Sequence, residues 1–181
     1  DIVCNENANG RIGLRFVNII LPPDYSPSNP ISEATITFKA QGNGANPASL
    51  TIRGERSDNS SQFATVDNNI SSRATTTASV SWTPGNWYND QTYTSPNLNT
   101  IVNEIVSRPG WREGNPITFI IGQTGGGCSY ADSFNTSPAD APLLTLKTAT
   151  TSATARDMIL DNQDANFQWQ GAWRYNHNNS A

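Results

Sequence analysis

The sequence predicts an all-β protein: a two-sheet antiparallel β-sandwich of jelly-roll type, with one short helix and a strand-like C-terminal extension. Apolar and polar residues alternate in short runs along the chain, which is typical of half-buried strands. Gly and Pro, 13 and 11 in number, punctuate these runs. Only 14% of the 181 residues are charged, whereas Asn, Thr and Ser make up about a third. That composition is typical of a secreted all-β protein and unlike that of a helical cytosolic enzyme.

The candidate strands follow one another along residues 1–147, and the first of them covers Arg11–Ile20. Their apolar positions, each separated from the next by one mostly polar residue, are Ile12, Leu14 and Phe16; Ile36, Phe38 and Ala40; Leu50 and Ile52; Ala78, Val80 and Trp82; Ile117, Phe119 and Ile121; and Leu144 and Leu146. Turn-forming residues separate the strands at 22–24, 42–44, 83–86 and 125–127. We expect the glycine run 125–127 to form a hairpin turn.

One segment has helical periodicity instead. Its apolar residues recur at i, i+3, i+4 and i+7: Leu98, Ile101, Val102 and Ile105. Ser95 is the expected N-cap, and Pro96 lies in the first turn, where proline is tolerated. The helix should end before Arg108-Pro109-Gly110. The pattern therefore predicts one short amphipathic helix over residues 96–106.

The C-terminal part of the chain differs from the rest. Residues 148–156 are mostly small and polar and indicate a linker between a sandwich domain (1–147) and an extension (157–181). In the extension, the apolar residues that would dock are Ile159, Phe167, Trp169 and Trp173. A two-stranded unit is only marginally stable alone. We therefore expect it to pack back on the first domain, to begin a truncated domain, or to dock into another molecule.

The two cysteines, Cys4 and Cys128, match no zinc or haem spacing. In an extracellular protein a disulfide is the simplest interpretation, and two buried free thiols are the alternative. Four tripeptides have the N-glycosylation pattern, at Asn59, Asn69, Asn135 and Asn178. No apolar run is long enough to insert in a membrane. The net charge of -4 argues against a nucleic-acid partner.

Several segments together are similar to a known family. The stretches IGLRFVNIILP, ISEATITFKA, SLTIRGERSDNSSQF and NLNTIVNEIVSRPGWREGNPITFII resemble the extracellular DNRLRE-like jelly-roll module of large secreted bacterial proteins. The tail resembles the opening strand of a golvesin-type β-sandwich domain in its stretch MILDNQDANFQWQGAW. The first resemblance implies an accessory module at the cell surface or outside the cell, which binds glycans or acts as a structural spacer. It implies no catalytic residue.

The residues themselves indicate no enzyme. The sole histidine, His177, lies in a polar terminal stretch, which makes a Ser-His-Asp or Cys-His site improbable and leaves no set of zinc ligands. A glycosidase needs two paired carboxylates. Nothing in the sequence pairs any of the candidates Glu33, Glu55, Asp58, Glu104, Glu113 and Asp132. We expect them to be surface charges or partners of Arg53, Arg56 and Arg73.

No cofactor is expected. If a structural calcium ion were bound, the loop acids to hold it would be Asp58, Asp67, Asp161 and Asp164. Exposed aromatic rings bind the apolar face of a sugar, and the candidate platforms are Trp87, Tyr88 and Trp111. Packing in the core or in loops is the alternative for these three rings, whereas Trp82 is in phase with a core face.

Two functions follow, one structural and one of ligand binding. Relative to the family it resembles, the chain is short of a strand at its N-terminal end, and its C-terminal end has a spare aromatic strand on a tether. Adding a strand to an open sheet edge buries side chains and pairs backbone in one step. When the donor joins a neighbour, the contact does not close and a fibre forms. We predict a head-to-tail assembly of identical subunits, with a carbohydrate-binding accessory module as the alternative.

Overall fold

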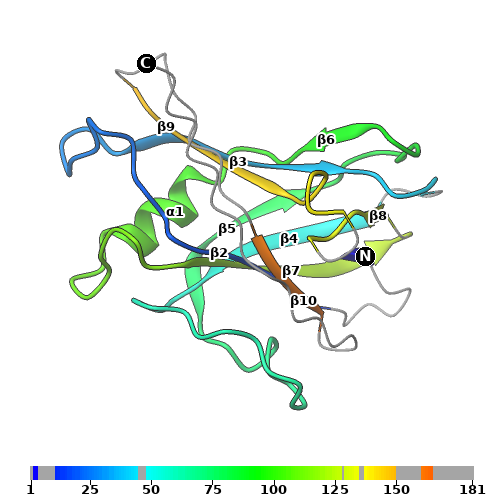
Figure 1. Ribbon diagram of the computed structural model, residues 1–181, viewed down its shortest axis with the longest axis horizontal. Helices are drawn as coiled ribbons and strands as arrows, with labels where there is room; N and C mark the ends of the chain where they lie inside the picture. The colour runs from blue at the N-terminus through cyan, green and yellow to red at the C-terminus, as the bar shows by residue number, and fades with distance from the viewer. Residues whose placement is uncertain are drawn as a thin grey trace.

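The computed structural model describes residues 2–3, 11–44, 48–127, 129–134, 137–149 and 160–164. These residues form ten strands and one helix (Figure 1), which are, in chain order, β1 (Ile2–Val3), β2 (Arg11–Phe16), β3 (Ile31–Lys39), β4 (Ala48–Glu55), β5 (Thr75–Trp82), β6 (Thr92–Thr94), α1 (Asn99–Val106), β7 (Ile117–Gly126), β8 (Tyr130–Ala131), β9 (Leu143–Thr148) and β10 (Leu160–Asp164). In the described part of the chain, no helix is long and apolar enough to cross a membrane.

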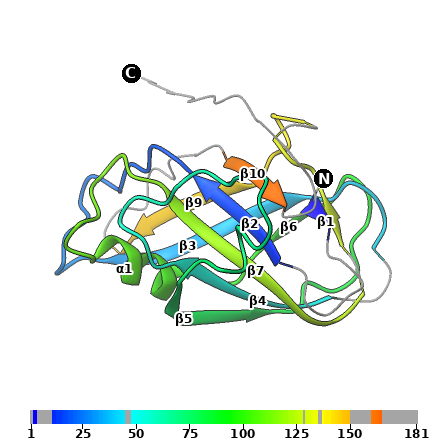
Figure 2. The same ribbon diagram turned by 90° about the horizontal axis from the view of Figure 1, so that it is seen from below.

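The strands form two facing layers, as the sequence predicts (Figure 2). One layer is a five-stranded sheet in the order β10-β2-β7-β4-β5, and the other is a three-stranded sheet in the order β6-β3-β9. The short pair β1–β8 continues the second layer, because Ala131 of β8 bridges to Ala40 just beyond β3. All strand pairs are antiparallel. The predicted all-β sandwich is confirmed.

The predicted alternation places the core between the two layers. Phe16 of β2 and Phe119 of β7 are fully buried and meet edge to face, with ring centroids 5.8 Å apart. Among the strand positions that the sequence analysis named within residues 1–147, all but two are buried. The exceptions, Ala78 and Val80, are partly buried and pack against the same core from the outer strand β5.

The helix is confirmed, but it begins at Asn99, three residues later than the sequence predicts. Ser95 is not the N-cap, because β3 takes its hydroxyl: Ser95 Oγ accepts the backbone N–H of Ile36 at 2.9 Å. Asn97 serves the helix start instead, since its Oδ1 accepts the backbone N–H of Asn99 at 3.0 Å. The apolar face of the helix is buried as expected, at Ile101, Val102, Ile105 and Val106.

Two other boundaries differ from the sequence analysis. The first long strand ends at Phe16, and Asn18, with φ of 50°, turns the chain before Ile19 re-enters the core. The glycine run is not a hairpin turn. Gly125 and Gly126 end β7 and pair with Ser49 and Ala48 of β4, so the partner strand extends the ladder through them.

The first residue of the predicted linker, Thr148, belongs to the sandwich, and residues 150–159 lie outside the described part of the chain. Thr148 is the last residue of β9, and its buried hydroxyl donates to the Asp24 carboxylate at 2.7 Å. The extension contributes β10, and its aromatic residues lie outside the described part of the chain.

Candidate functional site: the β2 edge and the clamp loop

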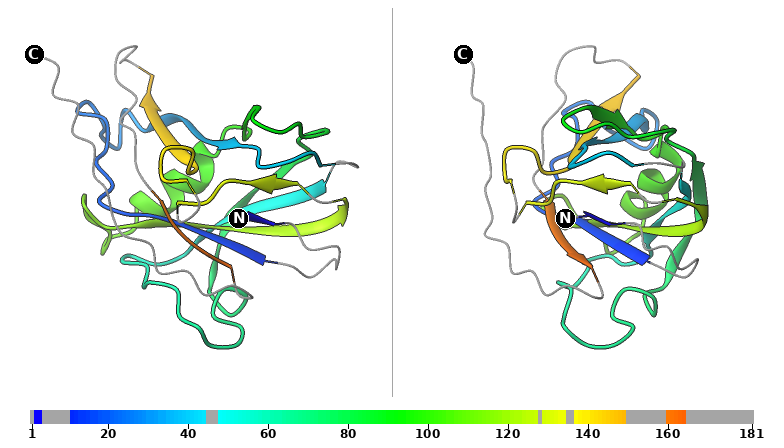
Figure 3. Two further views of the ribbon diagram at one scale, coloured as in Figure 1. Left: turned by 45° about the vertical axis from the view of Figure 1, so that its right-hand side comes forward. Right: turned by 90° about the vertical axis from the view of Figure 1, so that its right-hand side faces the viewer.

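Strand β10 adds to one edge of the five-stranded sheet. It pairs antiparallel with β2 over five positions, from Leu160 opposite Phe16 to Asp164 opposite Ile12. On its other side β2 pairs with β7 along its whole length, from Arg11 to Phe16. Without β10, β2 would be an edge strand with a row of unpaired backbone groups. Figure 3 shows β10 and β2 on the side of the sandwich opposite β5 and α1.

The outer face of β2 and β7 is covered by residues 56–74, which we call the clamp loop. Phe63 and Ile70 of the loop are 5% and 1% exposed and pack with Ile120, which points outward from β7. The Phe63 ring lies directly on the backbone of β2 at Gly13, where a Cβ atom would overlap it. Gly13 is therefore required by this close approach.

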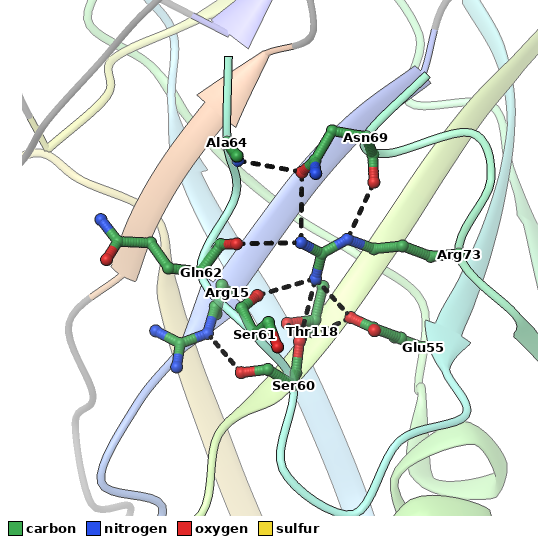
Figure 4. Close-up of polar contacts among 9 residues, drawn as sticks. All are labelled: Arg15, Glu55, Ser60, Ser61, Gln62, Ala64, Asn69, Arg73 and Thr118. Atoms are coloured by element: carbon green, nitrogen blue, oxygen red, sulfur yellow. Dashed lines mark hydrogen bonds and ion pairs between the residues drawn. The ribbon is translucent and has the colours of Figure 1, made fainter. Parts of the chain in front are cut away.

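Arg73 holds the clamp loop in shape (Figure 4). Its guanidinium lies 4.4 Å above the centre of the Phe63 ring. It donates to the Glu55 carboxylate at 2.7 Å, to the carbonyls of Ser61 at 2.8 Å, Gln62 at 3.1 Å and Asn69 at 3.0 Å, and to Asn69 Oδ1 at 3.2 Å. The side chains of Arg73 and Glu55 are only 9% and 13% exposed. Burial of this ion pair is compensated because several acceptors surround the guanidinium.

Ser60 ties the clamp loop to both strands beneath it. Its buried hydroxyl bonds to Glu55 Oε2 at 2.5 Å and to Thr118 Oγ1 of β7 at 2.7 Å. Its carbonyl accepts Arg15 Nε of β2 at 2.9 Å. The loop is therefore bonded to β2 through Arg15. Arg15 lies opposite Asp161 in the pairing of β2 with β10.

Five of the six candidate carboxylates accept a hydrogen bond or form an ion pair with a partner of their own. Glu55 is the partner of Arg73, which is one of the pairings that the sequence left open. Glu33 pairs with Lys147 at 2.7 Å, and Asp58 pairs with Arg108 at 2.6 Å. Glu113 accepts the backbone N–H of Leu21, and Glu104 accepts two backbone N–H groups of β5. Arg53 differs from the prediction, because it donates to the carbonyls of Thr76 and Thr77 rather than to an acid.

Asp132 lies in an acidic group at the end of β3. Asp132 is 8% exposed, and this burial, together with the charge of Asp140, raises the pKa of the Asp132 carboxyl. Asp140 has the opposite shift: hydrogen bonds from Lys39 and Ser137 lower its pKa. Lys39 lies 2.9 Å from Asp140 and 4.0 Å from Asp90. Among the described residues no group of acids, histidines or cysteines could hold a metal ion.

Most of the aromatic residues named as sugar platforms are buried. Trp87 is 4% exposed and stacks on Tyr93, with centroids 4.5 Å apart and planes 3° apart. Trp111 is 5% exposed. Both rings belong to the core cluster, which is the alternative that the sequence left open: the Tyr93 hydroxyl accepts the backbone N–H of Tyr88 in the loop of Trp87, and the Trp111 indole N–H donates to the Pro116 carbonyl. Of the three named residues, Tyr88 is the exposed one, at 60%.

A shallow depression that the sequence analysis did not foresee lies beside the clamp loop. Its volume is about 420 Å³, and it is lined by Arg15, Val17, Asn18, Asn59, Gly114, Asn115 and Pro116. The walls are tied together, since Gly114 donates to the Ile19 carbonyl at 2.7 Å and Asn115 Nδ2 to the Asp58 carbonyl at 3.0 Å. These residues come from three distant segments, so no local motif marks them.

Some of the remaining residues named from the sequence lie in the described part of the chain, and others do not. Asn59 is exposed, and Asn69 is partly buried with its Oδ1 accepting from Ala64 and Arg73. The following lie outside the described residues: Cys4, Cys128, Asn135, Asn178, His177, Ile159, Phe167, Trp169 and Trp173. Of the proposed calcium ligands, Asp58 binds Arg108 and Asp67 is exposed, while Asp161 and Asp164 belong to β10.

In comparisons with known proteins, no family model, no curated protein and no solved structure matches this chain. The resemblance to the DNRLRE-like and golvesin-type modules therefore stays a prediction. The function is inferred from the geometry of the chain itself.

Substituting Arg73 by Met should destabilise the protein by roughly 3–5 kcal/mol, because Glu55 would be left buried and unpaired. Substituting Lys147 by Met is the matched control: it breaks the ion pair with Glu33, whose side chains are 42% and 44% exposed, and should cost only about 0–1 kcal/mol. Urea unfolding at neutral pH measures both values. Equal losses for the two variants would mean that Arg73 does not organise the clamp loop.

Replacing Asp132 by Asn should raise the free energy of unfolding more at neutral pH than at acid pH. A raised pKa in the folded state means that ionisation of Asp132 costs stability, and this cost appears as pH rises through the raised pKa. Asp140→Asn is the control of opposite sign, because a lowered pKa stabilises the fold above the ordinary pKa and that contribution is lost on acidification. Unfolding free energies measured between about pH 3 and pH 7 should therefore give slopes of opposite sign relative to the parent chain.

Proposed function

We propose that this protein is a non-catalytic extracellular structural module whose subunits join head to tail by exchange of the C-terminal strand, as in a surface or extracellular fibre. The observation that carries the proposal is the pairing of β10 with the edge strand β2 over five positions. Edge pairing of this kind is made by backbone groups, and it is equally available to the same strand of a neighbouring copy.

The length of the connection supports exchange. Strand β9 ends at Thr148 and β10 begins at Leu160. Those twelve residue steps reach up to roughly 40 Å when extended. Such a tether allows β10 to pair with its own β2 or with the β2 of another copy. Because each chain then has one donor and one acceptor on different surfaces, the second arrangement propagates instead of closing.

The acceptor strand is also held by contacts other than those with β10. β2 is paired along its full length with β7, its Gly13 lies under the Phe63 ring, and its Arg15 is bonded to the Ser60 carbonyl. An ordered acceptor lowers the entropic cost of adding a strand. The clamp loop therefore has a function in this proposal: it holds the acceptor edge in the extended form that the donor recognises.

An extracellular setting is part of the proposal. Cys4 and Cys128 lie outside the described residues, but Val3, which precedes Cys4, is paired with Tyr130, two positions after Cys128. This pairing supports a Cys4–Cys128 disulfide, which would staple the N-terminal strand to the second layer. Stable disulfides of this kind are typical of oxidising compartments outside the cell.

Strand exchange should be detectable by disulfide trapping. Arg15 and Asp161 are directly opposite in the β2–β10 register. A chain carrying both Arg15→Cys and Asp161→Cys should form a ladder of covalently linked subunits on non-reducing gels. A mixture of the two single variants should form a linked pair of chains. The matched control combines Arg15→Cys with Asp164→Cys, which is out of register.

Cross-linking confined within single chains would contradict the assembly and establish that the extension docks only on its own domain. Light scattering and negative-stain imaging of the parent chain, with and without residues 157–181, provide an independent measurement. Filaments or large oligomers should be present in the first sample and absent from the second.

The depression beside the clamp loop supports a second candidate function, saccharide binding. It presents one guanidinium and three carboxamides, from Arg15, Asn18, Asn59 and Asn115. Such groups donate to and accept from sugar hydroxyls, and a volume of about 420 Å³ suits a ligand of one or two sugar rings. No acidic side chain lines the depression, which favours a neutral or acidic sugar over a basic one.

If the depression binds sugar, a glycan array should give at least one hit that is weakened about tenfold or more by Asn18→Ala. Gln91→Ala is the matched control, since it also removes an exposed carboxamide but lies outside the depression. An array without hits, or equal binding by all three proteins, would exclude this site.

A further inference from the structure

The five-stranded sheet has a second outer strand, β5, on the side opposite β2. At its bulge, Arg53 of β4 pairs with Ser79 and Glu55 pairs with Thr75, so residues 76–78 of β5 lie opposite the single residue Gly54 of β4. The backbone N–H groups of Thr77 and Ala78 donate to the two oxygens of Glu104 on α1, both at 2.8 Å. A carboxylate therefore occupies two donors that an added strand would use.

The carbonyl groups of the same bulge are also bonded to side chains. Arg53 Nη1 donates to the Thr76 carbonyl at 3.0 Å and to the Thr77 carbonyl at 3.4 Å. The Thr76 hydroxyl donates to the Ala78 carbonyl at 2.8 Å and accepts the Gly54 N–H at 2.9 Å. The backbone groups of residues 76–78 are therefore largely satisfied within the chain.

The facing edge of the second layer is closed in the same way. Strand β6 pairs with β3 only along Thr37–Lys39. The earlier backbone groups of β3 form hydrogen bonds with side chains that precede or belong to α1. Ser95 Oγ accepts the Ile36 N–H, and Asn97 Oδ1 accepts the Ala34 N–H, both at 2.9 Å. Asn103 accepts the Ile31 N–H at 3.1 Å and donates to the Ile31 carbonyl at 2.8 Å. One segment therefore covers two sheet edges.

Helix α1 fits between the two edges because of Gly54 in β4. A Cβ atom at Gly54 would lie 2.6 Å from Ile105 and 2.8 Å from Ile101, so a larger residue would push the helix away. In the right-hand view of Figure 3, α1 and β5 lie on one side of the sandwich and β2 with β10 on the other.

We infer that residues 95–104 are an edge-closing segment that confines strand addition to the β2 side. This inference rests on the proposed strand exchange. Natural sheets protect edges with charged side chains and covering helices, and here both devices act on β5. The consequence is that the five-stranded sheet has one acceptor edge among its described strands, β2, so that assemblies formed through this sheet are linear and unbranched and join each β2 to the β10 strand of another copy.

The test uses the full chain with Glu104→Ala. Residue-resolved hydrogen exchange should show that the Thr77 and Ala78 amides exchange about tenfold faster or more, because they lose their acceptors. Light scattering and imaging should show side-by-side association through the freed β5 edge. Glu33→Ala is the matched control, since it removes a carboxylate from β3 and leaves β5 unchanged. Glu104→Gln, which keeps one acceptor oxygen and the side-chain volume, should lie between the two and remains interpretable if Glu104→Ala unfolds.

The outcomes separate the two proposals. A parent chain that stays monomeric in light scattering contradicts strand exchange, while Glu104→Ala still reports on the β5 edge by comparison with it. Unchanged exchange at Thr77 and Ala78 and an unchanged state of association in the Glu104 variants would overturn the inference, whether or not the parent assembles.

Discussion

The architecture of this protein depends on how the backbone groups at the edges of its sheets are satisfied. A sandwich, unlike a closed barrel, leaves outer strands with N–H and C=O groups that need partners. On one side, side chains from 95–104 and from Arg53 and Thr76 supply those partners. On the other side, the partner of β2 is another strand, β10. The two sides of the molecule therefore differ: the β2 side takes an added strand, and the opposite side is closed by side chains.

The clamp loop shows how a polar network can stabilise an edge strand from its outer face. Arg73 and Glu55 are largely buried, and the cost of burying them is offset by the acceptors around the guanidinium and by the Phe63 ring. Through Ser60 the network reaches Thr118 on β7 and Arg15 on β2. The acceptor strand is therefore held from its outer face as well as from its neighbour β7.

The abundance of asparagine, serine and threonine acquires a structural explanation. Asn97, Asn103 and Ser95 bond to the backbone of β3, and Thr148 binds Asp24. These side chains act as short substitutes for strand partners, because a carboxamide or hydroxyl offers both donor and acceptor groups. Composition alone made them look like an uncharged surface, whereas many of them connect segments far apart in the chain.

The sequence by itself determined the fold class, the core and the helix. Period-two alternation specifies which side chains of a strand face inward, and this is a local property of the chain. The same argument found the buried face of α1. It failed at Ser95 and at the glycine run, where hydrogen bonds from distant strands decided the local structure.

Only the tertiary structure decided the site. The edge strand β2, the clamp loop and the depression combine residues that are distant in sequence, and their chemistry is that of common polar side chains. Trp87 illustrates the limit: the sequence left both a sugar platform and a packed ring open, and stacking on Tyr93 selected the second. Burial and hydrogen bonding of such residues depend on what the fold brings next to them, and no local pattern contains that information.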